Sequence, residues 1–129
     1  MKNFLDVPAN RYFGFQLVSR SVEGARISME VMQDLLQEAG VLHGGIISAI
    51  ADTAAVYAFY PDLEPTRTMT SIEFKVNFLN AALPGKGTLT AESKVLKRGK
   101  RTGVCEVEVA QGDKLIAKGI FTYLFFERS

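Results

Sequence analysis

The sequence predicts an α+β domain in which one antiparallel sheet curls around a single long helix. Three observations lead to this fold class. Residues 46–59 are apolar on every face that a helix would present, the segments before and after them alternate apolar and polar residues as strands do, and short turns rich in Gly or charge join those segments. With 129 residues and 47% hydrophobic content, residues 1–129 are expected to form a single domain.

Two strands are expected before the helix. Residues 13–17 and 25–31 alternate apolar and polar side chains, and Glu23-Gly24 provides the turn between them. This pattern predicts a hairpin with one buried face. Residues 32–40 are expected to form a short helix or a turn that ends at Gly40.

Four more strands are expected after Pro61, which ends the helix. Residues 72–78 alternate as a two-sided strand, and later strands are expected at about residues 88–96, 103–110 and 114–126. The last of these is apolar on both faces, so we expect it in the middle of the sheet or against a partner.

Several side chains are expected in the core. Cys105 alternates with Val107 and Val109 and is interpreted as a small core residue, not a nucleophile. The phenylalanines expected in the core are Phe13, Phe15, Phe74, Phe78, Phe121 and Phe125.

The predicted helix carries one carboxylate, Asp52, in an apolar setting. Burying an unpaired carboxylate is costly, so Asp52 must be hydrogen-bonded, neutralised or used; a structural role, with backbone or Ser48 as its partner, is the alternative to a functional one. The residues before the helix include no Ser, Thr or Asp that could cap it. The first-turn N–H groups are therefore expected to be free for an anion, or for an oxygen that becomes anionic during a reaction.

Composition excludes several classes of protein. A formal net charge of +1 argues against a dedicated nucleic-acid binder. The single cysteine cannot form an intrachain disulfide and favours a reducing cytoplasm, and one His with one Cys argues against a zinc site. The first residues contain no apolar run long enough for a signal peptide or a membrane span, so a cytoplasmic protein without a membrane partner is expected.

One motif carries a family resemblance. The segment Gly40-Val41-Leu42-His43-Gly44-Gly45, with Ala51-Asp52-Thr53-Ala54 after it, resembles the signature of hotdog-fold acyl-CoA thioesterases of the phenylacetate-pathway (PaaI-like) type. The likeness extends through residues 71–82 and the Arg-Gly-Lys-Arg turn. It implies a curved antiparallel sheet of about six strands around one central helix. It also implies hydrolysis of an aromatic or medium-chain acyl-CoA to the free acid and coenzyme A.

The resemblance assigns roles to five residues. Asp52 would be the catalytic carboxylate, either as general base toward water or as nucleophile. The backbone N–H of Gly45 would polarise the thioester carbonyl, which His43 would help to place, and Ser71 would orient the water or the acid. Gln37 stands where many members have Asn and offers the same amide on a longer arm.

A further set of residues is implied to bind the substrate and its coenzyme A: Gly44, Thr70, Lys97, Arg98, Gly99, Lys100 and Arg101. In this family the basic turn can hold the phosphates of coenzyme A, and its density of cations favours that role over a merely solvated hairpin. No metal or other cofactor is implied beyond the coenzyme A of the substrate.

Helix geometry adds a separate inference. At about 1.5 Å rise per residue, Gly45 and Asp52 lie roughly 10 Å apart along the axis, too far to serve one carbonyl carbon. A two-fold dimer with antiparallel helices would set Gly45 of one subunit beside Asp52 of the other, which agrees with how hotdog enzymes are built. We therefore expect a homodimer, or the dimer of dimers common in the family, with two shared sites per dimer.

Two other functions stay open at this point. Hotdog hydratases and dehydratases act on acyl thioesters too, but they surround their histidine with a proline-containing motif that His43-Gly44-Gly45 does not resemble. A non-catalytic acyl-CoA binder is the other alternative. Regulators of that kind carry a DNA-binding segment, for which this length leaves no room beside the domain.

Overall fold

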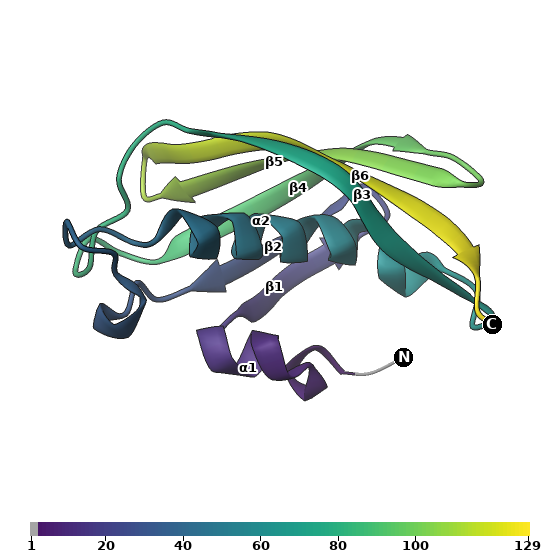
Figure 1. Cartoon of the computed structure of the whole chain (residues 1–129), viewed down its shortest axis with the longest axis horizontal. Coiled ribbons are helices and arrows are strands. Elements are labelled where there is room, and N and C mark those ends of the chain that lie inside the picture. The colour runs from purple at the N-terminus through teal and green to yellow at the C-terminus, as the bar shows by residue number, and fades with distance from the viewer. Residues whose placement is uncertain (1–2) are drawn as a thin grey trace.

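The computed structural model describes residues 3–129, which form a six-stranded antiparallel sheet curled around the helix α2 (Gly44–Phe59) (Figure 1). The strands are β1 (Gln16–Ser21), β2 (Gly24–Met29), β3 (Arg67–Phe78), β4 (Leu89–Arg98), β5 (Thr102–Gln111) and β6 (Lys114–Glu127). They follow the order β1-β2-β4-β5-β6-β3 across the sheet. The predicted fold class is confirmed.

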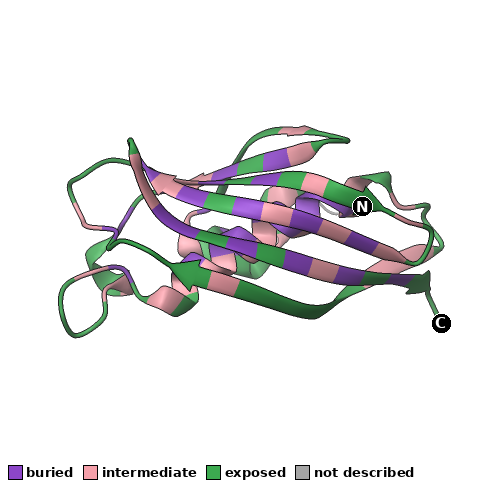
Figure 2. Cartoon of the chain, turned by 90° about the horizontal axis from the view of Figure 1, so that it is seen from above, coloured by how far each residue is buried: buried purple, intermediate pink, exposed green. Residues whose placement is uncertain are grey.

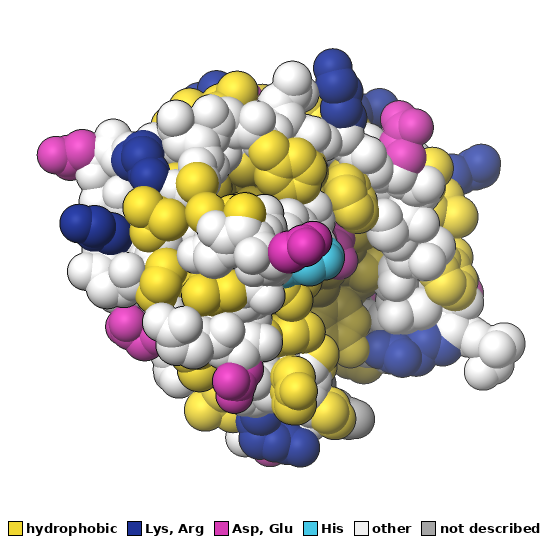
Figure 3. Space-filling view, turned by 60° about the vertical axis from the view of Figure 1, so that its left-hand side comes forward, with side chains coloured by type: hydrophobic (Ala, Val, Ile, Leu, Met, Phe, Trp, Pro, Cys, Tyr) yellow, Lys and Arg dark blue, Asp and Glu magenta, His cyan; other side chains and the backbone are white. Residues whose placement is uncertain are grey.

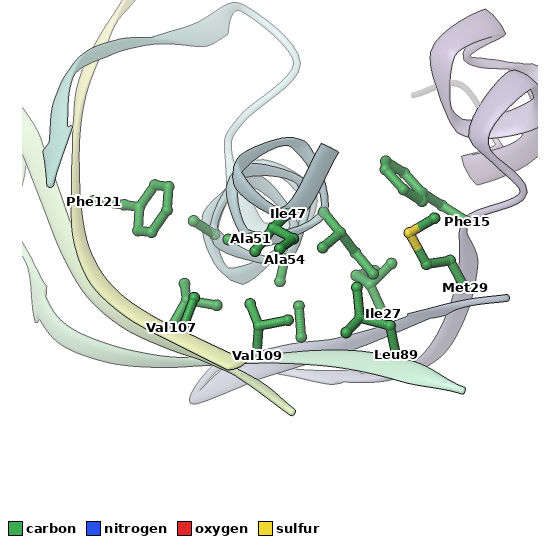
Figure 4. Close-up of a cluster of buried hydrophobic side chains, with 14 of the residues drawn as sticks. Phe15, Ile27, Met29, Ile47, Ala51, Ala54, Leu89, Val107, Val109 and Phe121 are labelled. Carbon is green, nitrogen blue, oxygen red and sulfur yellow. The ribbon is translucent and has the colours of Figure 1, made fainter. Parts of the chain in front are cut away.

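The hydrophobic core lies between α2 and the concave face of the sheet. Figure 4 shows Ile47, Ala51 and Ala54 of the helix facing Val107 and Val109 of the strands. Small alanines on this face let the helix approach the sheet closely, and the larger side chains of β2, β4 and β5 fill the space beside it. Within residues 3–129 no helix is long and apolar enough to cross a membrane.

The last strand has the interior position that its two apolar faces predict. β6 pairs with β5 on one side and with β3 on the other. Phe121, Tyr123 and Phe125 are buried in the core, whereas Ile120 and Leu124 alternate with them on the exposed outer face. Figure 2 shows this alternation of buried and exposed residues along the inner strands of the sheet.

The strand β3 forms one edge of the sheet and is largely exposed on both faces (Figure 2). Phe74 and Phe78 are 46% and 53% exposed, so the prediction that they belong to the core is wrong for the single chain. The reason is their place on an edge strand, beyond the reach of most of the helix. Phe15, Phe121 and Phe125 are buried as predicted, and Phe13 is half-buried.

The N-terminal segment differs from the prediction. The helix α1 (Pro8–Phe13) ends at Gly14, which is left-handed with φ 72°, and β1 begins only at Gln16. Pro at the start and Gly after the end are helix signals, but the alternation across Phe13 and Phe15 hid them. The buried face of the hairpin is therefore supplied by β2, since β1 is mostly exposed.

Residues 3–129 also contain short 3₁₀ helices, η1 (Phe4–Asp6), η2 (Gln33–Leu35) and η3 (Tyr60–Asp62). The second of these agrees with the short helix or turn predicted within residues 32–40. Gly40 ends that segment with φ 82°. The helix α2 ends at Phe59, close to the stop expected from Pro61, and the third 3₁₀ helix follows it directly.

Two arginines from the sheet hold the C-terminal end of α2. Arg20 Nε donates to the carbonyl of Tyr57 at 2.9 Å, and Arg98 Nη2 donates to that of Ala58 at 2.8 Å. Asp62 accepts hydrogen bonds from Arg20 and lies 3.2 Å from Nη1 of Arg98. We call Arg20, Asp62 and Arg98 the arginine clamp; it satisfies carbonyls that the helix itself leaves unpaired.

Candidate active site

Asp52 lies halfway along α2 and is bound by one side chain of the sheet. The hydroxyl of Tyr123, on β6, donates to Asp52 Oδ1 and lies 3.3 Å from the Asp52 carbonyl oxygen. Burial raises the pKa of Asp52, and the hydrogen bond from Tyr123 opposes that rise. Ser48 and the backbone, named as partners in the alternative of a structural role, do not hydrogen-bond to this carboxylate among the described residues; a tyrosine does.

The second carboxylate oxygen of Asp52 stays available. Within residues 3–129 no group hydrogen-bonds to Oδ2, and no buried side-chain oxygen of the described chain lacks a partner. Oδ2 is consequently not fully buried. An acid with one tethered oxygen and one accessible oxygen is suited to proton transfer or to nucleophilic attack.

A pocket of about 550 Å³ opens beside Asp52. Its walls come from α2, η3, β3, β6 and the N-terminal segment: Val7, Ala9, Asn10, Asp52, Thr53, Val56, Tyr57, Tyr60, Met69, Thr70, Ser71 and Tyr123. Asp52, Thr70 and Ser71, three of the residues predicted from sequence, thus line one cavity. Apart from Asp52, its described lining carries no acidic or basic side chain, so it is suited to an uncharged, largely apolar group.

Strand register brings Ser71 to this pocket. Ser71 lies directly opposite Tyr123 in the β3–β6 ladder, so both side chains stand on the face that meets the helix. The register shifts immediately afterwards, between Ser71 and Glu73. A bulge at this point increases the local twist of β3 and aims Ser71 independently of the residues that follow.

His43 caps the helix, so the prediction that no side chain does so is wrong. Its Nδ1 accepts the N–H of Gly45 at 2.9 Å, because an unprotonated imidazole nitrogen can replace the usual Ser or Asp oxygen. The Gly45 N–H is therefore occupied in this chain. A Cβ at Gly45 would lie 2.9 Å from the His43 ring, so the close contact requires glycine.

The start of α2 forms a second, separate part of the candidate site. His43 and Gly45 are exposed, and Figure 3 shows the histidine at the surface, beside apolar side chains that line a hollow. Gly44 packs against the side chain of Phe78: a Cβ added at Gly44 would lie 3.5 Å from the Phe78 ring. None of His43, Gly44 and Gly45 lines the pocket at Asp52. A single chain therefore does not bring the two parts together.

Gln37 lies in the turn that precedes the start of α2. Its side-chain oxygen accepts the N–H of Ala39, and its backbone N–H donates to Val41 at 2.8 Å. Gln37 is exposed in a local turn and does not line the pocket.

The basic turn joins β4 to β5. Arg98 belongs to the arginine clamp, and its guanidinium carbon lies 5.1 Å from the ring centroid of Phe59. Gly99 closes the turn through a 2.8 Å hydrogen bond to Thr102. In the described chain, Lys97, Lys100 and Arg101 form no ion pair with a carboxylate. These three cations, more than Arg98, are available to an anion.

Sequence reasoning missed Tyr123 and the N-terminal wall. Tyr123 carries a polar tip in an inward row between Phe121 and Phe125, and that single hydroxyl was the available signal. The sequence contained no comparable signal for the N-terminal wall of the pocket. Asn10 is buried and donates to the Phe4 carbonyl at 2.9 Å, which fixes the segment that brings Val7 and Ala9 to the pocket.

Cys105 is fully buried, and burial raises the pKa of its thiol to about 12. This confirms it as a core residue. No group of three or more His, Cys, Asp or Glu side chains in residues 3–129 is arranged to hold a metal ion.

Comparison with known proteins gives a consistent result. The sequence profile of the thioesterase superfamily matches residues 39–118. The 1,4-dihydroxy-2-naphthoyl-CoA hydrolase of Listeria monocytogenes is 31% identical over 104 residues, which are 80% of this chain and 83% of that protein.

Solved structures agree over almost the whole chain. The PaaI protein of E. coli, from the phenylacetic acid degradation operon, is 26% identical with a TM-score of 0.87 and covers 97% of this chain and 89% of its own. A thioesterase family protein of Silicibacter pomeroyi is 27% identical with a TM-score of 0.87, and the match covers 97% of this chain and 93% of that protein. These likenesses confirm the hotdog fold.

Proposed function

Because the chain belongs to the thioesterase superfamily and is a thioester hydrolase, we propose that it hydrolyses an aromatic or medium-chain acyl-CoA with Asp52 as its catalytic carboxylate. The observation that carries this proposal is the state of Asp52: a half-buried helix carboxylate, tethered through Oδ1, with Oδ2 open beside an apolar pocket. Its raised pKa brings it closer to the range in which a general base is effective near neutral pH.

Two reaction sequences use this carboxylate. As a general base, Asp52 takes a proton from water; the water oxygen attacks the thioester carbon, the C–S bond breaks, and coenzyme A leaves as a thiolate that takes up a proton. As a nucleophile, Oδ2 attacks the same carbon and expels coenzyme A, and water then cleaves the mixed anhydride. Ser71, in the same pocket, would orient the water or the acid. Neither sequence needs a cofactor beyond the coenzyme A of the substrate.

The oxyanion donor would come from a second copy of the chain. In a two-fold dimer with antiparallel α2 helices, the N–H of Gly45 would approach the thioester held at the partner's Asp52. The thioester oxygen would then replace Nδ1 of His43 as the acceptor of this N–H. Gly44 would let the substrate lie against the backbone.

The acyl group is proposed to occupy the pocket beside Asp52. A volume of about 550 Å³ and walls that include Val56 and Met69 are suitable for an aromatic ring or a medium chain. The Listeria relative, a naphthoyl-CoA hydrolase, supports the aromatic class. The coenzyme A phosphates would meet Lys97, Lys100 and Arg101 of the basic turn, with Thr70 nearer the thioester.

The first experiment measures thiol release from a panel of aromatic and straight-chain acyl-CoA esters. Asp52→Asn should lower kcat/KM by at least about a hundredfold, because it removes the proton acceptor without changing the shape of the site. Asp113→Asn, in the exposed β5–β6 turn, is the matched control and should retain full activity.

Each other result excludes part of the proposal. An Asp52→Asn protein as active as the control would exclude Asp52 as the catalytic acid. No hydrolysis of any ester, together with tight acyl-CoA binding by calorimetry, would leave a non-catalytic binder. Hydration of an enoyl-CoA without hydrolysis would indicate a hydratase instead.

A further inference from the structure

We propose that Tyr123 is a positioning residue for the reaction: its hydroxyl holds Asp52 Oδ1 and thereby leaves Oδ2 as the oxygen that meets the substrate. This inference rests on the proposed catalytic function of Asp52. It concerns a residue that the motif in α2 does not include. Tyr123 comes from β6, 71 residues later in the chain, and its hydrogen bond joins the sheet directly to the catalytic helix.

The packing around Tyr123 fixes the position of its hydroxyl. The side chain is 1% exposed, and its ring centroid lies 6.1 Å from that of Phe59. On the neighbouring strand β5, the residue opposite Tyr123 is Gly103. A Cβ at Gly103 would lie 2.8 Å from the ring of Phe59 and 2.5 Å from that of Phe125, so the aromatic rings fill the space that this glycine leaves. A buried ring with such neighbours has little freedom to move its hydroxyl.

Tyr123 can act only as a donor to Asp52 at working pH. Burial and the negative charge of Asp52 both raise the pKa of Tyr123, so its phenol keeps its proton. A phenol that donates to a carboxylate stabilises the charged form and gives it a preferred orientation. The same contact therefore orients Asp52 and favours its ionised form against the effect of burial.

In residues 3–129 no other side chain donates a hydrogen bond to Asp52. The remaining titratable groups that face Asp52 are Cys105 from β5, and Tyr57 and Tyr60 at the pocket wall. None of these three side chains can carry a positive charge, and no Lys or Arg among residues 3–129 lines the pocket. Without Tyr123, the Asp52 carboxylate would keep its desolvation and lose the hydrogen bond that opposes it.

The test compares Tyr123→Phe with Tyr57→Phe. Both remove one hydroxyl from the same pocket without changing the ring, but in residues 3–129 no hydrogen bond joins the Tyr57 hydroxyl to Asp52. Carbon-13 NMR of the labelled Asp52 carboxyl gives its pKa, and the acidic limb of the kcat/KM profile reports the same group in catalysis. The Asp52 pKa and the midpoint of the acidic limb should each rise by about one pH unit in Tyr123→Phe. In Tyr57→Phe the two quantities should stay at their wild-type values.

A second variant keeps the test valid if Tyr123→Phe fails to fold. Replacement of Tyr123 alone by 3-fluorotyrosine retains the hydroxyl and makes it a stronger donor. The Asp52 pKa should then fall below the wild-type value. A purely structural role for the ring would move neither the titration nor the acidic limb in this variant.

The two proposals fail in distinguishable ways. An Asp52 pKa that is identical in wild type, Tyr123→Phe and the fluorinated protein overturns the role of Tyr123, even if the wild type is fully active. A wild type that hydrolyses no ester overturns the proposed function, and with it the reaction that Tyr123 would serve. The NMR titration is independent of activity and separates the two results.

Discussion

The charge on Asp52 opposes folding at neutral pH. Burial raises its pKa, so the folded chain disfavours the ionised form more than the unfolded chain does. The sign follows from linkage: this destabilisation is absent below the unfolded pKa of about 4, grows as the pH rises toward the raised folded pKa, and is complete above it. The residue proposed to carry the chemistry is then a residue that weakens the fold.

Asp52→Asn should therefore stabilise the protein while it removes activity. The melting temperature of the variant should exceed that of the wild type by a few degrees at pH 7, and the two should converge near pH 4. Thermal unfolding followed by circular dichroism at both pH values measures this, with Asp113→Asn as the exposed control. A variant that melts below the wild type at pH 7 would show that the charge itself contributes to stability.

At the scale of elements, the arginine clamp sets the C-terminal end of α2 and so the position of the helix over the sheet. The hydrogen bond from Arg20 lowers the pKa of Asp62, and the charges of Arg20 and Arg98 lower it further. A carboxylate with a lowered folded pKa contributes stability above its unfolded pKa of about 4 and loses it as the pH falls through the folded value.

Asp62→Asn should accordingly lower the free energy of unfolding at pH 7. The difference from the wild type should shrink as the pH falls below about 4 and through the lowered folded pKa, where wild-type Asp62 also takes up a proton. Urea unfolding across this range gives the difference directly. Glu92→Gln is the matched control, because Glu92 pairs with Arg26 on the open surface and is 56% exposed. Equal losses in the two variants would show that the clamp is no stronger than a surface ion pair.

The spacing of apolar residues predicted a helix or strand well where that element is long and keeps the same pattern of burial along its length. The apolar run of α2 and the alternation in β3 to β6 predicted those elements within a few residues. It failed at α1, which has 6 residues and ends beside an alternating aromatic pair. The motif in α2 led to Asp52, but the partner of Asp52 depends on how β6 crosses the helix. No local pattern contains that contact, and only the inward position of Tyr123 hinted at it.

At the scale of the whole molecule, two features point beyond one chain. The start of α2 and the pocket at Asp52 are separate, and the edge strand β3 exposes Ile72, Phe74 and Phe78. An exposed apolar edge is a surface that soluble proteins normally cover. A second copy placed across β3 and α2 would cover it and join the two parts of the site.

Subunit mixing tests the shared site. Asp52→Ala and Gly45→Pro chains should each be inactive alone, but coexpressed chains should regain activity, since one site of each mixed dimer takes both functional groups from unaltered positions. Random pairing makes half of the dimers mixed, so about a quarter of wild-type activity is expected per chain. Differently tagged chains allow the mixed dimer to be isolated. Mixed dimers without activity would place the acid and the oxyanion donor in one subunit.

The burial of Cys105 has a practical consequence for enzymology. It is the only cysteine of the chain, it is 0% exposed, and a thiol with a pKa of about 12 is hardly ionised at neutral pH. A colorimetric thiol reagent added to the folded enzyme should consequently report released coenzyme A with almost no protein background. The same reagent would count one new thiol per chain when the protein unfolds, so a single dye can follow both turnover and denaturation.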